Sequence, residues 1–315
     1  MKALMYHYVR PERADLPYFR YLHVEDFAAQ LDWIEANFGF VSRPDFERTL
    51  TTGRPAEGAV LTFDDGFADH FDHVLPELAR RGLWGVFYVP TGVYDRAELL
   101  DVHRIHLLIG RHGGVAVLDH LVGLIDDDML VDKGNAAFRT KTYRYQDNDE
   151  ATNEVKRILN YYISYDHRAE VLARLFGDLI GSEAEEFRRF YMSTDQLLEM
   201  AEAGMVIGSH SVSHPVFSRL DVETQWREID RSFAFLEQAL GREIDTFCYP
   251  YGGFHNFTDD TERLLQKRGC RYAFNVEPRD VAPADLKSRP MALPRYDCNM
   301  FAHGGATMGS DRPPA

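Results

Sequence analysis

Cysteine is scarce in this chain of 315 residues, which contains only Cys248, Cys270 and Cys298. Three scattered thiols are too few for a disulfide framework or for a zinc site built from cysteines. Basic side chains are also in the minority, because 35 lysines and arginines face 50 aspartates and glutamates, a formal net charge of −15. Binding to nucleic acid or to an anionic membrane depends on clustered Lys and Arg, so we expect neither partner.

Long hydrophobic runs are absent as well. No apolar stretch reaches the length of a membrane-spanning helix, so we expect no membrane insertion. The apolar run in the N-terminal stretch MKALMYHYV is too short for a signal peptide, and the stretch is typical of a first strand instead. We therefore expect a cytoplasmic protein, unless a leader has been removed. Nothing in the sequence specifies an oligomeric state.

The chain does contain short apolar runs that alternate with amphipathic stretches, a pattern typical of a parallel α/β fold. Strands are predicted at 2–8, 59–64, 84–89, 205–208, 246–249 and 271–275. Helices are predicted at 68–81, from Ser193 to Gly204, after Asp221 and at Asp259–Arg268. Ser193 and Gln196 have the spacing of a capping box, and a glycine follows or ends three of these helices.

Residues from about 91 to 192 interrupt this alternation. Helical patterns at 98–110, 115–126 and 151–176 predict a helical insertion within one domain that spans residues 1–315. The insertion has two interpretations. It is either a packing element or a lid whose aromatic side chains, among them Tyr143 and Tyr145, stack on a substrate.

Two consecutive carboxylates, Asp64 and Asp65, end a predicted strand in the stretch LTFDDG. At a strand end the chain turns, so both side chains can reach one site. The motif has simpler explanations, because Asp-Asp-Gly is a common turn and an aspartate before a helix is a common N-cap.

Two histidines, His210 and His214, follow another predicted strand in the stretch GSHSVSHP. A single histidine in a loop is usually a solvated surface residue. Two histidines and a carboxylate, however, form a metal triad that leaves positions open for water and substrate. The second carboxylate can then act as the base that a metal-assisted hydrolase needs. Both motifs end predicted strands, where parallel barrels build their active sites.

Together, TFDDG and the downstream SHSVSHP resemble the polysaccharide deacetylase family, the NodB-homology domain of carbohydrate esterase family 4. The resemblance implies an α/β fold, a distorted and incomplete (β/α) barrel. It also implies that Asp64 is the catalytic base and that Asp65, His210 and His214 bind one divalent metal ion. Zinc is the default ion for this ligand set, and iron, cobalt or nickel suit the same ligands.

The family's third motif, usually Arg-x-Pro-Tyr, reads FCYPYGG here, so Cys248 stands where the arginine is expected. The resemblance implies that the backbone N–H of Tyr251 helps to hold an oxyanion. Arg295, in LPRYDC, is our candidate for the missing arginine. The general acid of the family, a histidine at the end of a late strand, is not evident. The alternatives are His7, His70, His255 and His303.

The resemblance therefore predicts a metal-dependent hydrolase that removes an acetyl group from an N-acetylated sugar, either a saccharide or a nucleotide-linked glycan precursor. Two alternatives stay open. One is a hydrolase of another amide or of an O-acetyl ester that uses the same site. The other is a sugar-binding relative that keeps the metal and has no turnover.

Overall fold

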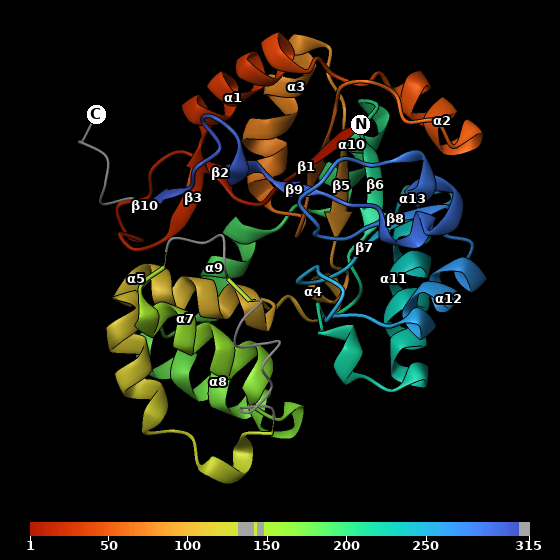
Figure 1. The fold of residues 1–315 in the computed structure, drawn as a ribbon. Coiled ribbons are helices and arrows are strands. Elements are labelled where there is room, and N and C mark those ends of the chain that lie inside the picture. Colours follow the sequence, from red (N-terminus) through yellow and green to blue (C-terminus); the bar gives the residue numbers. More distant parts are fainter. Residues whose placement is uncertain (132–141, 144–147, 309–315) are drawn as a thin grey trace. The chain divides into compact units, whose positions relative to one another are not determined.

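A seven-stranded parallel sheet forms the centre of the fold (Figure 1). The structure is a computed structural model, and it describes residues 1–131, 142–143 and 148–308. The strand order is β8–β7–β6–β5–β4–β1–β9. The strands are β1 (Lys2–Tyr6), β4 (Ala59–Phe63), β5 (Gly85–Val89), β6 (Val206–Ser209), β7 (Thr246–Cys248), β8 (Tyr272–Phe274) and β9 (Tyr296–Asp297). All six predicted strands are present, with small differences at their ends, and β9 was not predicted.

One short segment near the end of the chain contacts β8 at one edge of the sheet and forms β9 at the other. Leu293 forms a parallel bridge with Phe274 of β8, and its N–H donates to the carbonyl of Ala273 at 2.8 Å. A few residues later, β9 pairs with β1 through Tyr296 and Leu4. The result is the distorted, incomplete (β/α) barrel that the sequence predicted.

Side chains alternate between the two faces of the sheet, as they must along a strand. On β4, Leu61 and Phe63 belong to the larger apolar cluster, together with Ile229 and Phe233 of a covering helix. Val60 belongs to a second cluster with side chains of β5, β7 and β8. Thr62 and Asp64 continue the face of Val60, which places them inside the curled sheet.

The chain divides into two compact units. Unit 1 comprises Met1–Pro11, Leu22–Arg96 and Arg189–Ala306 and contains the sheet. Its helices are α1 (Val24–Asn37), α2 (Arg43–Thr52), η1 (His70–Val74), α3 (Leu75–Arg81), α4 (Gly92–Arg96), α10 (Thr194–Glu202), η4 (Phe217–Arg219), α11 (Val222–Leu240), α12 (Asp259–Arg268), α13 (Pro283–Ser288), η5 (Pro290–Ala292) and η6 (Cys298–Met300). Two short strands, β2 (Val9–Arg10) and β3 (Arg20–His23), pair in parallel.

Several predicted helix boundaries in unit 1 are confirmed. Ser193 and Gln196 form a capping box at the start of α10, and the side chain of Asp221 accepts from the N–H of Thr224 at the start of α11. The predicted helix at 68–81 begins as one turn of π-helix, η1, and continues as α3. Helices α1 and α2 were not predicted.

Unit 2 comprises Glu12–Tyr21, Ala97–Arg188 and the end of the described chain from Thr307. Its long middle segment lies within the predicted insertion and is helical as expected. The elements are α5 (Asp101–Val122), η2 (Asp127–Met129), α7 (Glu150–Arg157), η3 (Ile158–Tyr162), α8 (Tyr165–Leu179), most of α9 (Glu183–Phe190) and β10 (Thr307–Met308). Gly113 has non-helical backbone angles inside α5, close to the break predicted between two helices.

The lid interpretation of the insertion stays a prediction. Tyr143 packs against Tyr161, with ring centroids 6.0 Å apart, and its hydroxyl oxygen accepts from the Asn160 side chain at 2.9 Å. Tyr145 lies outside the described residues. None of the described helices is both long enough and apolar enough to cross a membrane.

Candidate active site

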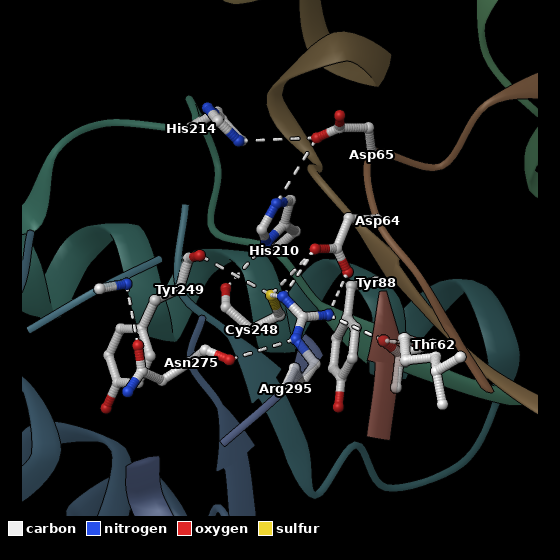
Figure 2. Close-up of polar contacts among 12 residues, drawn as sticks. Thr62, Asp64, Asp65, Tyr88, His210, His214, Cys248, Tyr249, Asn275 and Arg295 are labelled. Atoms are coloured by element: carbon white, nitrogen blue, oxygen red, sulfur yellow. Dashed lines mark hydrogen bonds and ion pairs between the residues drawn. The ribbon is translucent and has the colours of Figure 1, made fainter. Parts of the chain in front are cut away.

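Asp65, His210 and His214 converge at the end of the sheet, as Figure 2 shows. One carboxylate oxygen of Asp65 lies 3.5 Å from Nε2 of His210 and 3.6 Å from Nε2 of His214. Ligands bonded to one tetrahedral zinc ion at 2.0–2.2 Å would lie about 3.4 Å apart. All three side chains are buried. The donor set and its spacing therefore fit a divalent metal ion.

Unusual backbone angles direct these side chains to a common point. Asp65 lies two residues after the end of β4 and has φ 79°, so the chain turns sharply and its side chain leaves the strand's alternation. Ser211, His214 and Tyr251 also have left-handed backbone, at φ 67°, 55° and 63°. Residues other than glycine rarely adopt this backbone conformation, and those that do cluster at functional sites. Their grouping here supports a functional site.

The orientation of His210 is set by the neighbouring strand. Its Nδ1 lies 2.8 Å from the backbone carbonyl of Cys248, so Nδ1 carries the proton and Nε2 presents its lone pair toward Asp65. Burial lowers the pKa of His210, against the smaller opposing effect of the Asp64 and Asp65 carboxylates. A neutral imidazole with this tautomer is the form that binds a metal.

Asp64 lies on the inside of the curled sheet, where Arg295 donates hydrogen bonds to both of its carboxylate oxygens (Figure 2). Nη1 and Nη2 of Arg295 each donate to one carboxylate oxygen at 2.8 Å. Burial by itself would raise the pKa of Asp64, but the Arg295 guanidinium, with smaller contributions from His210 and His7, more than offsets burial and lowers that pKa to about 2. Asp64 is therefore ionised at neutral pH.

Arg295 is fully buried and is held by groups from several strands. Nη1 donates to the hydroxyl of Thr62 at 2.9 Å, Nε donates to the carbonyl of Asn275 at 3.4 Å, and Nη2 lies 2.9 Å from Sγ of Cys248. The small side chain of Cys248 leaves room for the guanidinium. Arg295 thus occupies the place next to Asp64 for which we proposed it, and its catalytic role stays a prediction.

A second group of side chains, Asp64, His210 and Cys248, also has the spacing of metal ligands. The Arg295 guanidinium already contacts Asp64 and Cys248 in this group. A metal ion there would lie against a buried positive charge, which low dielectric makes strongly unfavourable. Burial also raises the pKa of the Cys248 thiol well above its ordinary value, which disfavours the thiolate that metals bind.

Tyr251 lies beside the metal triad, with its ring centroid 4.8 Å from that of His214. It belongs to a tight turn after β7, in which the N–H of Gly252 donates to the carbonyl of Tyr249 at 3.2 Å. The next residue, Gly253, donates its N–H to the side chain of Asn275 at 2.8 Å. The position of Tyr251 is compatible with an oxyanion-binding N–H, and that role stays a prediction.

The four histidines considered as general acid lie in different surroundings. His70 is fully buried, and burial lowers its pKa to about 4, so it is neutral at pH 7. His303 is exposed near the end of the described chain, and His255 follows the Tyr251 turn. His7 follows β1, and a positive charge there would lower the pKa of both Asp64 and Asp297. His7 therefore lies near enough to Asp64 to affect the pKa of that carboxyl.

Three positions with roles in this arrangement were not singled out in the sequence. Asn275 contacts both Arg295 and the Tyr251 turn, Asp297 lies near His7, and Glu228 holds the loop between His210 and His214. Asn275 follows β8 and ends the strand predicted at 271–275, which is the sequence signal that could have marked it. Asp297 ends β9, which was not predicted, so no such signal marks it. Glu228 lies within a long amphipathic helix and carries no such signal.

Comparison with known proteins supports the same fold. The family model described as polysaccharide deacetylase matches residues 52–273. A search of curated proteins finds no significant match. Among solved structures, the Streptococcus pyogenes deacetylase PplD in complex with acetate is 16% identical, with a TM-score of 0.58 over 94% of this chain and 91% of that chain. IcaB from Ammonifex degensii is 19% identical, with a TM-score of 0.55 over 94% and 90%.

Proposed function

This chain belongs to the polysaccharide deacetylase family, and we propose that it removes the acetyl group from an N-acetylated sugar with one divalent metal ion. The observation that carries the proposal is the pairing of two neighbouring carboxylates with different partners. Asp65 faces two histidines, whereas Asp64 is held by a buried arginine. One carboxylate is thus suited to bind a cation and the other to accept a proton.

Asp65, His210 and His214 would hold the ion, and zinc is the default for two imidazoles and one carboxylate, with iron, cobalt or nickel as alternatives. When bound, such an ion lowers the pKa of water and polarises a carbonyl oxygen. The remaining work of the reaction falls to side chains and backbone groups of the protein.

Asp64 is the base in this proposal. Its pKa of about 2 keeps it ionised, so it can accept a proton from the water that attacks the acetyl carbonyl carbon. Arg295 is a positioning residue, because its two hydrogen bonds fix the plane of the Asp64 carboxylate. The N–H of Tyr251, next to His214, would donate to the carbonyl oxygen as negative charge develops there.

His7 is the general acid in this proposal. As the bond between the carbonyl carbon and nitrogen breaks, the amine must gain a proton, and His7 follows β1 near enough to Asp64 to affect its pKa. Its backbone carbonyl accepts from Nε2 of the neutral His70 at 2.8 Å, which holds this part of the chain in place. The products are acetate and a free amino sugar.

The test is release of acetate from a panel of substrates by the protein loaded with Zn²⁺, Co²⁺, Ni²⁺ or Fe²⁺. The panel contains N-acetylglucosamine oligomers, a nucleotide-linked N-acetyl sugar, an O-acetylated sugar and a simple N-acetyl amide, with Asp64→Asn as the blank. Release from the N-acetylated sugars supports the proposal. Release only from the ester or the simple amide would favour the alternative hydrolase, and sugar binding without turnover would favour a non-enzymatic relative.

A further inference from the structure

The loop that joins His210 and His214 is held by one carboxylate of the long helix α11 (Val222–Leu240). One oxygen of Glu228 accepts from the N–H of Val212 at 2.9 Å and from the N–H of Ser213 at 2.8 Å. The other oxygen accepts from the hydroxyl of Ser213 at 2.8 Å. Hydrogen bonds to a charged acceptor are the stronger kind. All three bonds reach the residues between the two histidines.

A second contact of α11 holds the start of the same loop. Ser232 lies one turn after Glu228, on the same face of the helix. Its hydroxyl lies 2.6 Å from that of Ser209, the residue before His210. The Ser209 hydroxyl accepts from the N–H of Ser211 at 3.2 Å. Helix α11 therefore contacts the chain immediately before each histidine, at Ser209 and at Ser213.

The conformation of this loop requires such contacts. Ser211 and His214 both have left-handed backbone, which residues with a side chain adopt only where the surroundings hold them. On the other side, the N–H groups of Thr91 and Gly92 donate to the carbonyls of Ser211 and Val212 at 3.0 and 2.8 Å. In these bonds the loop's carbonyls accept, whereas Glu228 accepts from two of the loop's N–H groups. The loop is held from both sides.

We propose that Glu228 is a positioning residue for metal binding, which holds the loop so that His214 faces Asp65 and His210. This inference rests on the proposed function, because it takes the three residues as metal ligands. Glu228 does not touch the metal triad and belongs to a different element. Loss of a group that hydrogen-bonds directly to a metal ligand typically weakens metal affinity by 10- to 100-fold, and we expect an effect of this order for a residue that holds the loop carrying a ligand.

The test compares Glu228→Ala and Glu228→Gln with Glu223→Gln, a matched control on the same helix. Glu223 is exposed and pairs only with the exposed Arg227 in the contacts described. The dissociation constant for Zn²⁺ is measured by competition with a chelating dye, and hydrogen exchange of the Val212 and Ser213 amides is measured in metal-free protein. Circular dichroism checks the fold, and Glu228→Gln, which keeps the shape and one acceptor oxygen, serves if Glu228→Ala does not fold.

We expect roughly 10- to 100-fold weaker Zn²⁺ binding for Glu228→Ala, a smaller loss for Glu228→Gln, and faster exchange of both amides. The control should bind Zn²⁺ like the wild type. Unchanged binding in both Glu228 variants, with binding lost in His214→Ala, would overturn this inference and leave the metal site intact. Binding that is absent in the wild type, or unaffected in His214→Ala, would overturn the proposed function and this inference with it.

Discussion

Arg295 donates two hydrogen bonds of 2.8 Å to Asp64, across a sequence separation of 231 residues. Arg295 is fully buried and Asp64 nearly so. The arginine reaches this place because the segment from Leu293 to Asp297 contacts β8 at one end and β1 at the other. The same segment therefore links the edges of the sheet and supplies the partner of the proposed base.

Replacement of Arg295 by methionine should affect both stability and catalysis. Asp64 would keep its burial and lose its counter-charge, which typically lowers the free energy of unfolding by about 3–5 kcal/mol. The loss of an orienting partner should lower kcat by roughly 10- to 1000-fold. Metal content should stay near that of the wild type, because Asp65, His210 and His214 are unchanged. Denaturant unfolding, steady-state kinetics and elemental analysis measure the three effects.

The double variant Arg295→Met/Asp64→Asn serves as the control for stability. It removes both charges, so it should be more stable than Arg295→Met alone. A folded Arg295→Met protein with the kcat of the wild type would show that Arg295 has a purely structural role.

His210→Ala and His214→Ala should each lose the metal and the activity. Each removes one of the nitrogens that lie 3.5–3.6 Å from the Asp65 oxygen. The fold should survive, because neither histidine belongs to the apolar clusters that hold the sheet and helices together. Elemental analysis of dialysed protein and circular dichroism check both points. Normal metal content in both variants would show that the ligands are assigned wrongly.

His7→Gln should lower kcat by roughly 100- to 10,000-fold if His7 is the general acid. The variant should still bind Zn²⁺, because His7 is not among the three proposed ligands. The matched control is His303→Gln, whose side chain is exposed, and it should leave kcat unchanged. A full loss of activity in His303→Gln with none in His7→Gln would show that His303, and not His7, is the general acid.

The stability of the metal-free protein should fall below pH 6.5, partly because of His70. Burial lowers the pKa of His70 from 6.5 to about 4, so the unfolded chain binds a proton in this range that the folded chain does not. The contribution of neutral His70 to the free energy of unfolding is therefore fully present above pH 6.5. It decreases as the pH falls toward 4, by roughly 3 kcal/mol in total.

The His70→Gln variant tests this origin, because its amide keeps a donor for the carbonyl of His7. Its free energy of unfolding, measured by denaturant titration in EDTA, should depend less steeply on pH between 6.5 and 4.5. The exposed His303→Gln variant is the control and should keep the slope of the wild type. An unchanged slope in His70→Gln would assign the acid sensitivity to other groups.

The sequence predicted the main strands because buried parallel strands are short apolar runs with clear ends. It missed β9, which has only two residues, Tyr296 and Asp297, and no apolar run. That strand depends on pairing with β1, a contact between opposite ends of the chain. Helices α1 and α2 were also missed, although Ser42 caps α2 and Gly53 ends it.

The site was predictable where its residues are neighbours in sequence. Asp64 and Asp65 are adjacent, and His210 and His214 are four positions apart, so both motifs can be recognised in the sequence. The contact of Arg295 with Asp64 was reached only as a hypothesis, from the absence of an arginine at Cys248. Glu228 was not found at all, since its role depends on which face of α11 meets the loop.

The division of labour between Asp64 and Asp65 is the central claim, and metal content with turnover of the two asparagine variants tests it most directly. Asp64→Asn should hold close to one Zn²⁺ per chain and turn over at least about 100-fold more slowly than the wild type. Asp65→Asn should bind Zn²⁺ weakly, because it loses the charged ligand between His210 and His214. An Asp64→Asn protein that stays active, or one that loses its metal while Asp65→Asn keeps it, would contradict the account.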